Sequence, residues 1–164
     1  MVGRTRRVRV VVFGALVALV MVVAQLVASA VPTATVDGHF TGTGPVGPRS
    51  ALRLAVTGRG GVPVQGVGAV VLNVTATDAS AETYLTVWPT GEPRPATSNL
   101  NIAPGTTVPN LVVARVGVDG TVSILNAVGS VHVVVDVLGW FPTGSSVVTV
   151  PPVRLADTRA GSVT

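Results

Sequence analysis

From residue 51 onward, hydrophobic and polar residues alternate along the chain with a period of two. The clearest run is 67–77, VGAVVLNVTAT, in which Leu72 and Val74 alternate with Asn73 and Thr75. This period is that of a β-strand with one buried face. We therefore expect the side chains of Leu72 and Val74 to point into a core.

The same alternation, interrupted by Gly- and Pro-rich turns, predicts seven strands. They are 51–57, 67–77, 82–88, 97–102, 108–116, 121–127 and 130–141. Pro109 must begin its strand or lie at a sheet edge, because proline cannot donate to a central ladder. The links GVDG (117–120) and NAVGS (126–130) are typical of tight hairpins. With no helical period in this part of the chain, the pattern predicts an all-β antiparallel β-sandwich, with a Greek-key barrel as the alternative.

The first thirty residues follow a different pattern. A basic start is followed by the apolar stretch Val10–Val27 and then by Ala28-Ser29-Ala30, the small-x-small pattern of a signal peptidase site. We expect 1–30 to be a signal peptide cleaved after Ala30, which predicts a secreted or cell-surface protein. The alternative is an uncleaved membrane anchor, since about eighteen apolar residues lie near the lower limit for a span.

Charge and cysteine content narrow the function classes. All eleven basic residues are arginines and four of them precede Ala30, which leaves seven arginines against seven acidic residues after it. A neutral mature chain gives no basic patch for nucleic acid. The absence of cysteine excludes disulfides, thiol catalysis and cysteine-ligated metals.

The segment 31–50 is rich in Gly, Pro and Thr and predicts a linker or a loose arm. It contains the spacing of a dinucleotide-binding loop, Gly42-x-Gly44-x-x-Gly47. That motif requires a strand before it and a helix after it. The prolines at 45 and 48 oppose a helix, so we expect no cofactor.

Candidate catalytic residues are few. His132 and Asp136 share one face of a strand, but four residues of extended chain separate them by about 13 Å, too far to chelate one metal or share a proton. His39 lies in the predicted arm, and the chain has no G-x-S-x-G elbow. We therefore expect neither a catalytic nor a metal site.

Asparagine recurs in and beside the predicted strands, where it is disfavoured. These polar positions are Asn73, Asn99, Asn101, Asn110 and Asn126, together with Asp136. The favoured interpretation is that the amides satisfy backbone groups at bulges and strand ends. The alternative is a polar ligand site, for a sugar rather than Ca²⁺, because calcium requires several carboxylates.

The aromatic residues give the one candidate binding platform. Tyr84 and Trp88 share a strand face, and with Arg94 and Asn99 they would form a stacking surface for a glycan ring. Against this, packing of Trp88 over the core is the commoner arrangement for a large apolar ring. Trp140 and Phe141, at the end of the last strand, are expected to plug the core.

Four blocks of sequence resemble a repeat unit of secreted and cell-surface proteins of actinobacteria. The blocks are LNVT (72–75), YLTVWPTGEPRPATSNLN (84–101), PNL (109–111) and DVLGWF (136–141), and the match covers about 51–141. The resemblance implies an extracellular β-domain that is often repeated or appended to exported enzymes. It brings no established catalytic residues.

The end of the chain resembles the opening of such a unit. PVRLADTR (152–159) is similar to its first block, PxRLxDTR. We therefore expect 142–164 to be a spacer followed by the opening strand of a second, truncated unit. The alternative is that this segment folds back to supply an opening strand to the first unit.

Together these features predict a non-catalytic extracellular domain of structural or adhesion type. The alternative is a carbohydrate-binding module, and a hydrolase is a remote third. The partners expected are cell-wall or other glycans, or other surface proteins, with membrane contact only through the N-terminal segment.

Overall fold

The computed structural model describes residues 34–150 and 153–155, which belong to two compact units, 1–41 and 42–164. The predicted signal peptide, with Ala28 and Ala30, lies outside the described residues. In the first unit, Thr35 closes a short turn by donating its hydroxyl to the carbonyl oxygen of His39 at 2.6 Å. Across the described ranges, no helix has the length and apolar character needed to cross a membrane.

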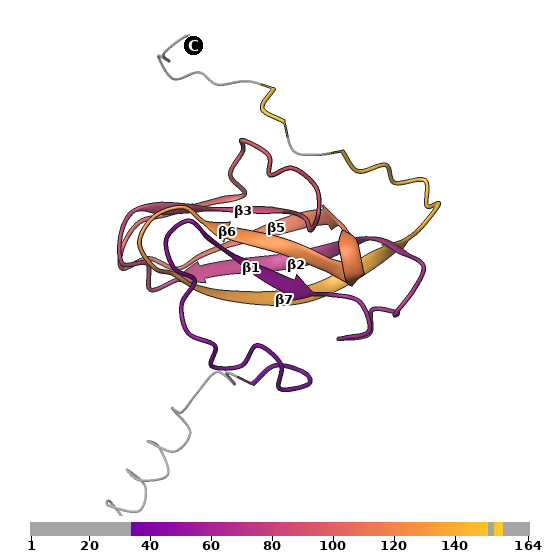
Figure 1. Ribbon diagram of the computed structural model, residues 1–164, viewed down its shortest axis with the longest axis horizontal. Helices are drawn as coiled ribbons and strands as arrows, with labels where there is room; N and C mark the ends of the chain where they lie inside the picture. The colour runs from indigo at the N-terminus through magenta and orange to yellow at the C-terminus, as the bar shows by residue number, and fades with distance from the viewer. Residues whose placement is uncertain (1–33, 151–152, 156–164) are drawn as a thin grey trace, which may run out of the picture. The chain divides into compact units, whose positions relative to one another are not determined.

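The second unit is a sandwich of two antiparallel sheets, with strand orders β1-β6-β3-β4 and β5-β2-β7 (Figure 1). The described strands are β1 (Ser50–Ala55), β2 (Val67–Thr77), β3 (Thr83–Pro89), β4 (Leu100–Ile102), β5 (Val108–Arg115), β6 (Thr121–Asn126) and β7 (His132–Pro142). A single 3-10 turn, η1 (Val118–Gly120), accompanies them. The predicted all-β sandwich is confirmed, and each predicted strand is present.

Most of the links between these strands pass from one sheet to the other. The exception in the described chain is the β3–β4 link, because β3 and β4 are neighbours in the same sheet. The links from β5 to β6 and from β6 to β7 each pass from one sheet to the other. The hairpins predicted at 117–120 and 126–130 are therefore wrong. Asp119 and Gly120 do adopt left-handed backbone, with φ of 55° and 69°. An Asp-Gly dipeptide indicates a sharp turn. Here the turn leads the chain from β5 in one sheet to β6 in the other.

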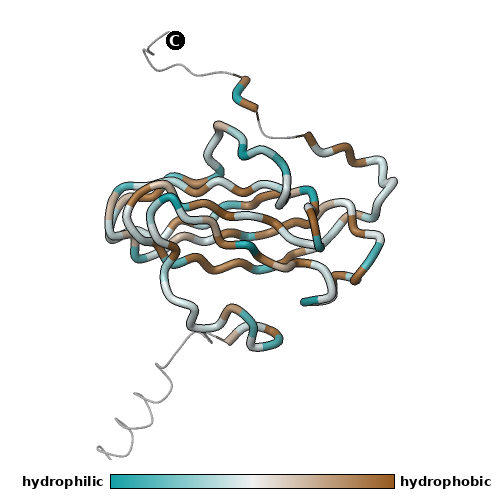
Figure 2. The backbone as a smooth tube through the Cα atoms, viewed as in Figure 1, coloured by the Kyte–Doolittle hydropathy of each residue, from teal (hydrophilic) through white to brown (hydrophobic). Residues whose placement is uncertain are grey.

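The core lies between the two sheets and follows the alternation of the sequence. In β2, the side chains of Val70, Leu72 and Val74 are fully buried, whereas Asn73 and Thr75 are half-buried on the opposite face. The other sheet contributes its own buried row: Leu85, Val87, Val122 and Ile124. Figure 2 shows hydrophobic residues concentrated along the strands and paler, more polar segments between them. The predicted inward direction of Leu72 and Val74 is confirmed.

The edges of the three-stranded sheet carry features that oppose pairing with another chain. Pro109 lies in the edge strand β5, as predicted, and offers no backbone donor. The long edge strand β7 is interrupted by a shift in its pairing with β2, because Val71 pairs with Gly139 while Leu72 pairs with Val137. Prolines and bulges of this kind blunt exposed sheet edges.

One buried amide joins three separate segments of the sandwich. The side chain of Asn126, at the end of β6, is fully buried. Its Nδ2 lies 2.9 Å, 3.2 Å and 2.9 Å from the carbonyl oxygens of Val46, Gly47 and Gly129. Its Oδ1 accepts a 2.7 Å hydrogen bond from the hydroxyl of Thr83 in β3. Asn126 therefore ties the chain before β1 to β3 and to the β6–β7 link.

The continuation of the chain beyond β7 starts with a tight turn. The amide of Thr143 donates to the carbonyl of Gly66 at 2.8 Å, and the amide of Ser145 donates to that of Pro142 at 3.1 Å. Residues 143–150 and 153–155 contain no strand. The second-unit and fold-back predictions both depend on residues 151–152 and 156–164, which lie outside the described residues.

The inward face of β2 generates a stability test. Leu72 is 1% exposed, so Leu72→Ala should lower the free energy of unfolding by about 2–5 kcal/mol. The matched control is Leu111→Ala, because Leu111 is 59% exposed and should change it by less than about 0.5 kcal/mol. Denaturant unfolding of both variants measures the difference. Equal losses would show that the faces are assigned wrongly.

The amide junction generates a second test. Asn126→Ala removes one partner from each of three part-buried carbonyl groups and from the Thr83 hydroxyl, at about 1–3 kcal/mol for each group left unsatisfied. We expect a loss of about 3 kcal/mol or more in unfolding free energy. Asn101→Ala, at an exposed asparagine of β4, should change it by less than about 0.5 kcal/mol. A loss at Asn126 as small as that at Asn101 would contradict the role of the amide.

Candidate functional site

The link between β3 and β4, residues 90–99, folds over the outer face of the four-stranded sheet. The hydroxyl of Thr86 donates to the carbonyl of Thr97 at 2.9 Å, and the Nε1 of Trp88 donates to the carbonyl of Glu92 at 3.1 Å. These contacts bury Thr86 and half-bury Trp88. The indole of Trp88 therefore holds the link in place.

Two further contacts fix the same link. The Oδ1 of Asn99 accepts a 2.7 Å hydrogen bond from the backbone amide of Val87. The carboxylate of Glu92 forms a 2.6 Å salt bridge with Arg115 of β5. Because contacts hold the link on both sides of Arg94, they fix the position of the Arg94 backbone over the sheet.

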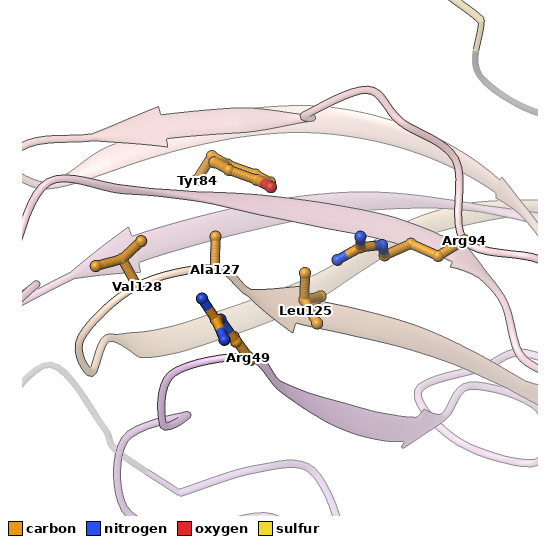
Figure 3. A pocket seen from close by; sticks show the side chains of 6 residues that line it. All are labelled: Arg49, Tyr84, Arg94, Leu125, Ala127 and Val128. Carbon is orange, nitrogen blue, oxygen red and sulfur yellow. The ribbon is translucent and has the colours of Figure 1, made fainter.

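A cavity of about 350 Å³ lies where this link approaches the end of β6. Its lining residues are Arg49, Tyr84, Arg94, Leu125, Ala127 and Val128, which we call the arginine pocket (Figure 3). Tyr84 and Ala127 are neighbours across the β3–β6 pairing, since the amide of Ala127 donates to the carbonyl of Tyr84 at 3.2 Å. Figure 3 shows the side chains of Arg49 and Arg94 coming from different segments, with Leu125 between them.

The two guanidinium groups of the arginine pocket differ from the neighbouring arginines. Arg53 pairs with Asp119 at 2.6 Å, and Arg115 pairs with Glu92 at 2.6 Å. Within the part of the chain that the structure describes, Arg49 and Arg94 have no hydrogen bond or ion pair, and no acidic residue lines the pocket. The pocket therefore holds positive charge that the lining does not neutralise.

Arg49 also has an unusual backbone. Its φ is 54°, in the left-handed region that a residue with a side chain adopts at a cost of about 1–3 kcal/mol. It follows Gly47, whose carbonyl contacts the Asn126 amide, and it precedes β1. The fold thus holds Arg49 in a conformation that would suit glycine better.

The sequence placed Tyr84, Trp88, Arg94 and Asn99 on one platform. The structure brings Tyr84 and Arg94 together in the arginine pocket. Trp88 and Asn99 instead hold the 90–99 link and do not line the pocket. Trp88 is half-buried beneath the 90–99 link on the outer face of the sheet, so it lies neither over the core nor on the expected platform.

Several pocket residues were not anticipated from the sequence: Arg49, Leu125, Ala127 and Val128. Arg49 fell in the segment read as a linker, although Val46 pairs with Val131 and the second unit begins at Gly42. The other three come from β6 and the residues after it, which meet Tyr84 only through a long-range strand pairing. The positive φ of Arg49 leaves no signal in a single sequence.

The asparagines act mainly on the backbone, as the favoured interpretation predicts. Asn126 and Asn99 do so as described above, and the Nδ2 of Asn110 donates to the carbonyl of Asn99 at 2.6 Å. Asn73 differs, because its Nδ2 lies 3.5 Å from the Oδ2 of Asp136 on the neighbouring strand. That pair lies on the outer side of the three-stranded sheet.

The outer side of the three-stranded sheet is a second distinctive surface. Its exposed hydrophobic side chains are Leu111 and Val113 on β5 and Val134 and Leu138 on β7, which we call the apolar face. They are between 44% and 61% exposed and flank the Asn73–Asp136 pair of the central rows. A contiguous exposed hydrophobic surface is a candidate site of interaction with another molecule.

The histidine and carboxylate side chains of the described residues do not gather at one place. His132 and Asp136 are both exposed on β7, separated by Val134, and Asp136 lies nearest to Asn73. His39 lies 3.4 Å from Asp37 in the first unit. Among the described residues there is no group of three or more His, Asp or Glu side chains positioned to hold a metal ion.

The two aromatic residues at the end of β7, Trp140 and Phe141, differ in their exposure to solvent. Trp140 is 38% exposed, so it does not plug the core as the sequence predicted. Phe141 is half-buried and lines a second cavity of about 270 Å³, together with Arg115 and residues 142–145 and 147–149. The shift in pairing at Leu138 interrupts the regular alternation of inward and outward side chains before the end of β7.

No protein-family model matches the chain, and no curated protein matches it significantly.

Proposed function

We propose that this chain is a non-catalytic extracellular domain of structural or adhesion type, which binds a protein partner through the apolar face. The observation that carries the proposal is the exposure of four large hydrophobic side chains on one side of one sheet: Leu111, Val113, Val134 and Leu138. Those residues lie on the strands of a rigid sandwich, which presents them without an ordering cost at binding.

The composition of the apolar face suits adhesion to another protein. Its rows carry one carboxylate, Asp136, and one arginine, Arg115 at the end of β5, which is paired with Glu92. The central backbone beneath it is paired within the sheet. Interface cores are depleted in charge, and polar groups at their rim set orientation. The Asn73–Asp136 pair supplies such a polar group beside the hydrophobic side chains.

Two features of the sequence support an extracellular location. The first thirty residues have the order of a secretory signal, and blocks across 51–141 resemble units of secreted and cell-surface proteins. The chain also has no cysteine, so it has no thiol that an oxidising environment would modify. Its sandwich is held by packing and by the Asn126 amide instead.

A second candidate function is carbohydrate binding, and the arginine pocket favours it. An aromatic ring, two cationic groups and an apolar floor converge on one open cavity. The partner would then be a glycan of the cell wall or the environment, and the pocket and the apolar face would act independently on different sheets.

Adhesion through the apolar face is tested with beads coated with the domain. The beads are offered to beads carrying the same domain and to cells of the producing bacterium, and attachment is counted. We expect attachment to at least one of these surfaces, and at least about a tenfold loss with the double variant Val113→Lys/Leu138→Lys, because binding would bury two unpaired charges.

The matched control is Val64→Lys, which adds a lysine at an exposed valine between β1 and β2 that is not part of the apolar face. It should attach as the unmodified domain does. Equal attachment by the double variant, with an unchanged unfolding midpoint, would overturn the assignment of the adhesive surface.

A further inference from the structure

We propose that the arginine pocket binds a sugar that bears a carboxylate, and that Arg49 and Arg94 together hold the carboxylate. This inference rests on the second candidate function, carbohydrate binding, and names the class of glycan. It also adds Arg49, which precedes β1 by one position, to the residues expected to contact the ligand.

The charge of the pocket points to an anion. Its two guanidinium groups have no partner within the described residues, whereas the nearby Arg53 and Arg115 are each paired with a carboxylate. Arginine presents a planar fork of donors that matches the two oxygens of a carboxylate. An incoming carboxylate would therefore satisfy donors that the protein itself leaves unpaired.

The rest of the lining points to a sugar rather than to a bare ion. The volume of about 350 Å³ is within the range of small-ligand sites and far exceeds what one carboxylate needs. Leu125, Ala127 and Val128 give it an apolar floor, and Tyr84 adds an aromatic ring with a hydroxyl group. One face of a pyranose ring consists of C–H groups, which pack on such a ring, while its hydroxyls bond to the tyrosine.

The backbone segments that carry the two arginines are held in place before any ligand arrives. Arg49 is fixed by its position between Gly47, which contacts the buried Asn126 amide, and β1. Arg94 belongs to the link that Trp88, Asn99 and Glu92 hold over the sheet. The left-handed backbone of Arg49 persists because the surrounding structure imposes it.

The local nature of the charge separates this proposal from binding of nucleic acid. After Ala30 the chain has equal numbers of arginines and acidic residues, so this part of the chain has no net positive charge. A polyanion requires a run of cationic contacts along its backbone. Two arginines in one cavity suit a single acidic group on one sugar ring.

The test is titration of the domain with trigalacturonate, with its methyl ester and with sodium acetate, followed by NMR chemical shifts. The ester keeps the sugar and removes the charge, and acetate keeps the charge and removes the sugar. We expect trigalacturonate to bind at least about tenfold more tightly than either control, since hydrogen bonds between ionised groups have that strength.

Three variants locate the site. Arg94→Met and Arg49→Gly should each weaken trigalacturonate binding at least about tenfold, whereas Arg53→Gln, which removes one positive charge from the same sheet outside the pocket, should change it less than about twofold. Arg49→Gly should not lower the unfolding midpoint, because glycine accepts the left-handed backbone. A loss of binding with an intact midpoint is the result that a merely structural role of Arg49 would not give.

The remaining outcomes each decide a different point. Equal binding of the acid and its ester would overturn the carboxylate specificity and leave glycan binding standing. Equal binding of acetate would reduce the pocket to an adventitious anion site. Binding of none of the three, and of no neutral glycan on an array, would overturn the carbohydrate-binding candidate itself, while adhesion through the apolar face would be unaffected.

Discussion

The buried side-chain amide of Asn126 is the constraint on which this sandwich and its pocket depend. A fully buried amide without partners would destabilise the fold, and here both of its ends are satisfied by groups from three segments. Those segments are the chain before β1, the start of β3 and the β6–β7 link. They also carry Arg49, Tyr84 and Val128, each close in sequence to a residue that the amide contacts. One hydrogen-bonding group thus joins the stability of the core to the geometry of the pocket.

The two sheets share one core and present different surfaces. The outer side of the four-stranded sheet is partly covered by the 90–99 link, which buries Thr86 and leaves a cationic cavity where the cover ends. Among the described residues no such link covers the outer side of the three-stranded sheet, which exposes hydrophobic side chains of β5 and β7. The period-two pattern allows this, because residues that do not face the core are free to be polar, charged or apolar. A structural or adhesive role and a glycan-binding role can therefore occupy opposite sides of one small domain.

The elements of the fold were predictable because local patterns determine them. Alternation in β2 identified the inward direction of Leu72, and proline chemistry placed Pro109 in an edge strand. The topology was not predictable in the same way, since Asp119-Gly120 signals a left-handed turn whether the chain continues in the same sheet or crosses to the other. For a related reason, only some of the residues of the arginine pocket could be predicted from the sequence. Tyr84 and Arg94 lie close in sequence, whereas Arg49 and Ala127 reach them only through the pairing of β1 and β3 with β6.

The binding of a carboxylate by a preformed pair of arginines is tested most directly by observing the guanidinium groups themselves. Arginine Nε–H signals, assigned by NMR, are followed while trigalacturonate is added to the domain. The signals of Arg49 and Arg94 should shift together and saturate together, while those of Arg53 and Arg115, already paired with Asp119 and Glu92, should stay in place. Equal shifts at all four arginines, or shifts at Arg53 and Arg115 alone, would contradict a site in the arginine pocket.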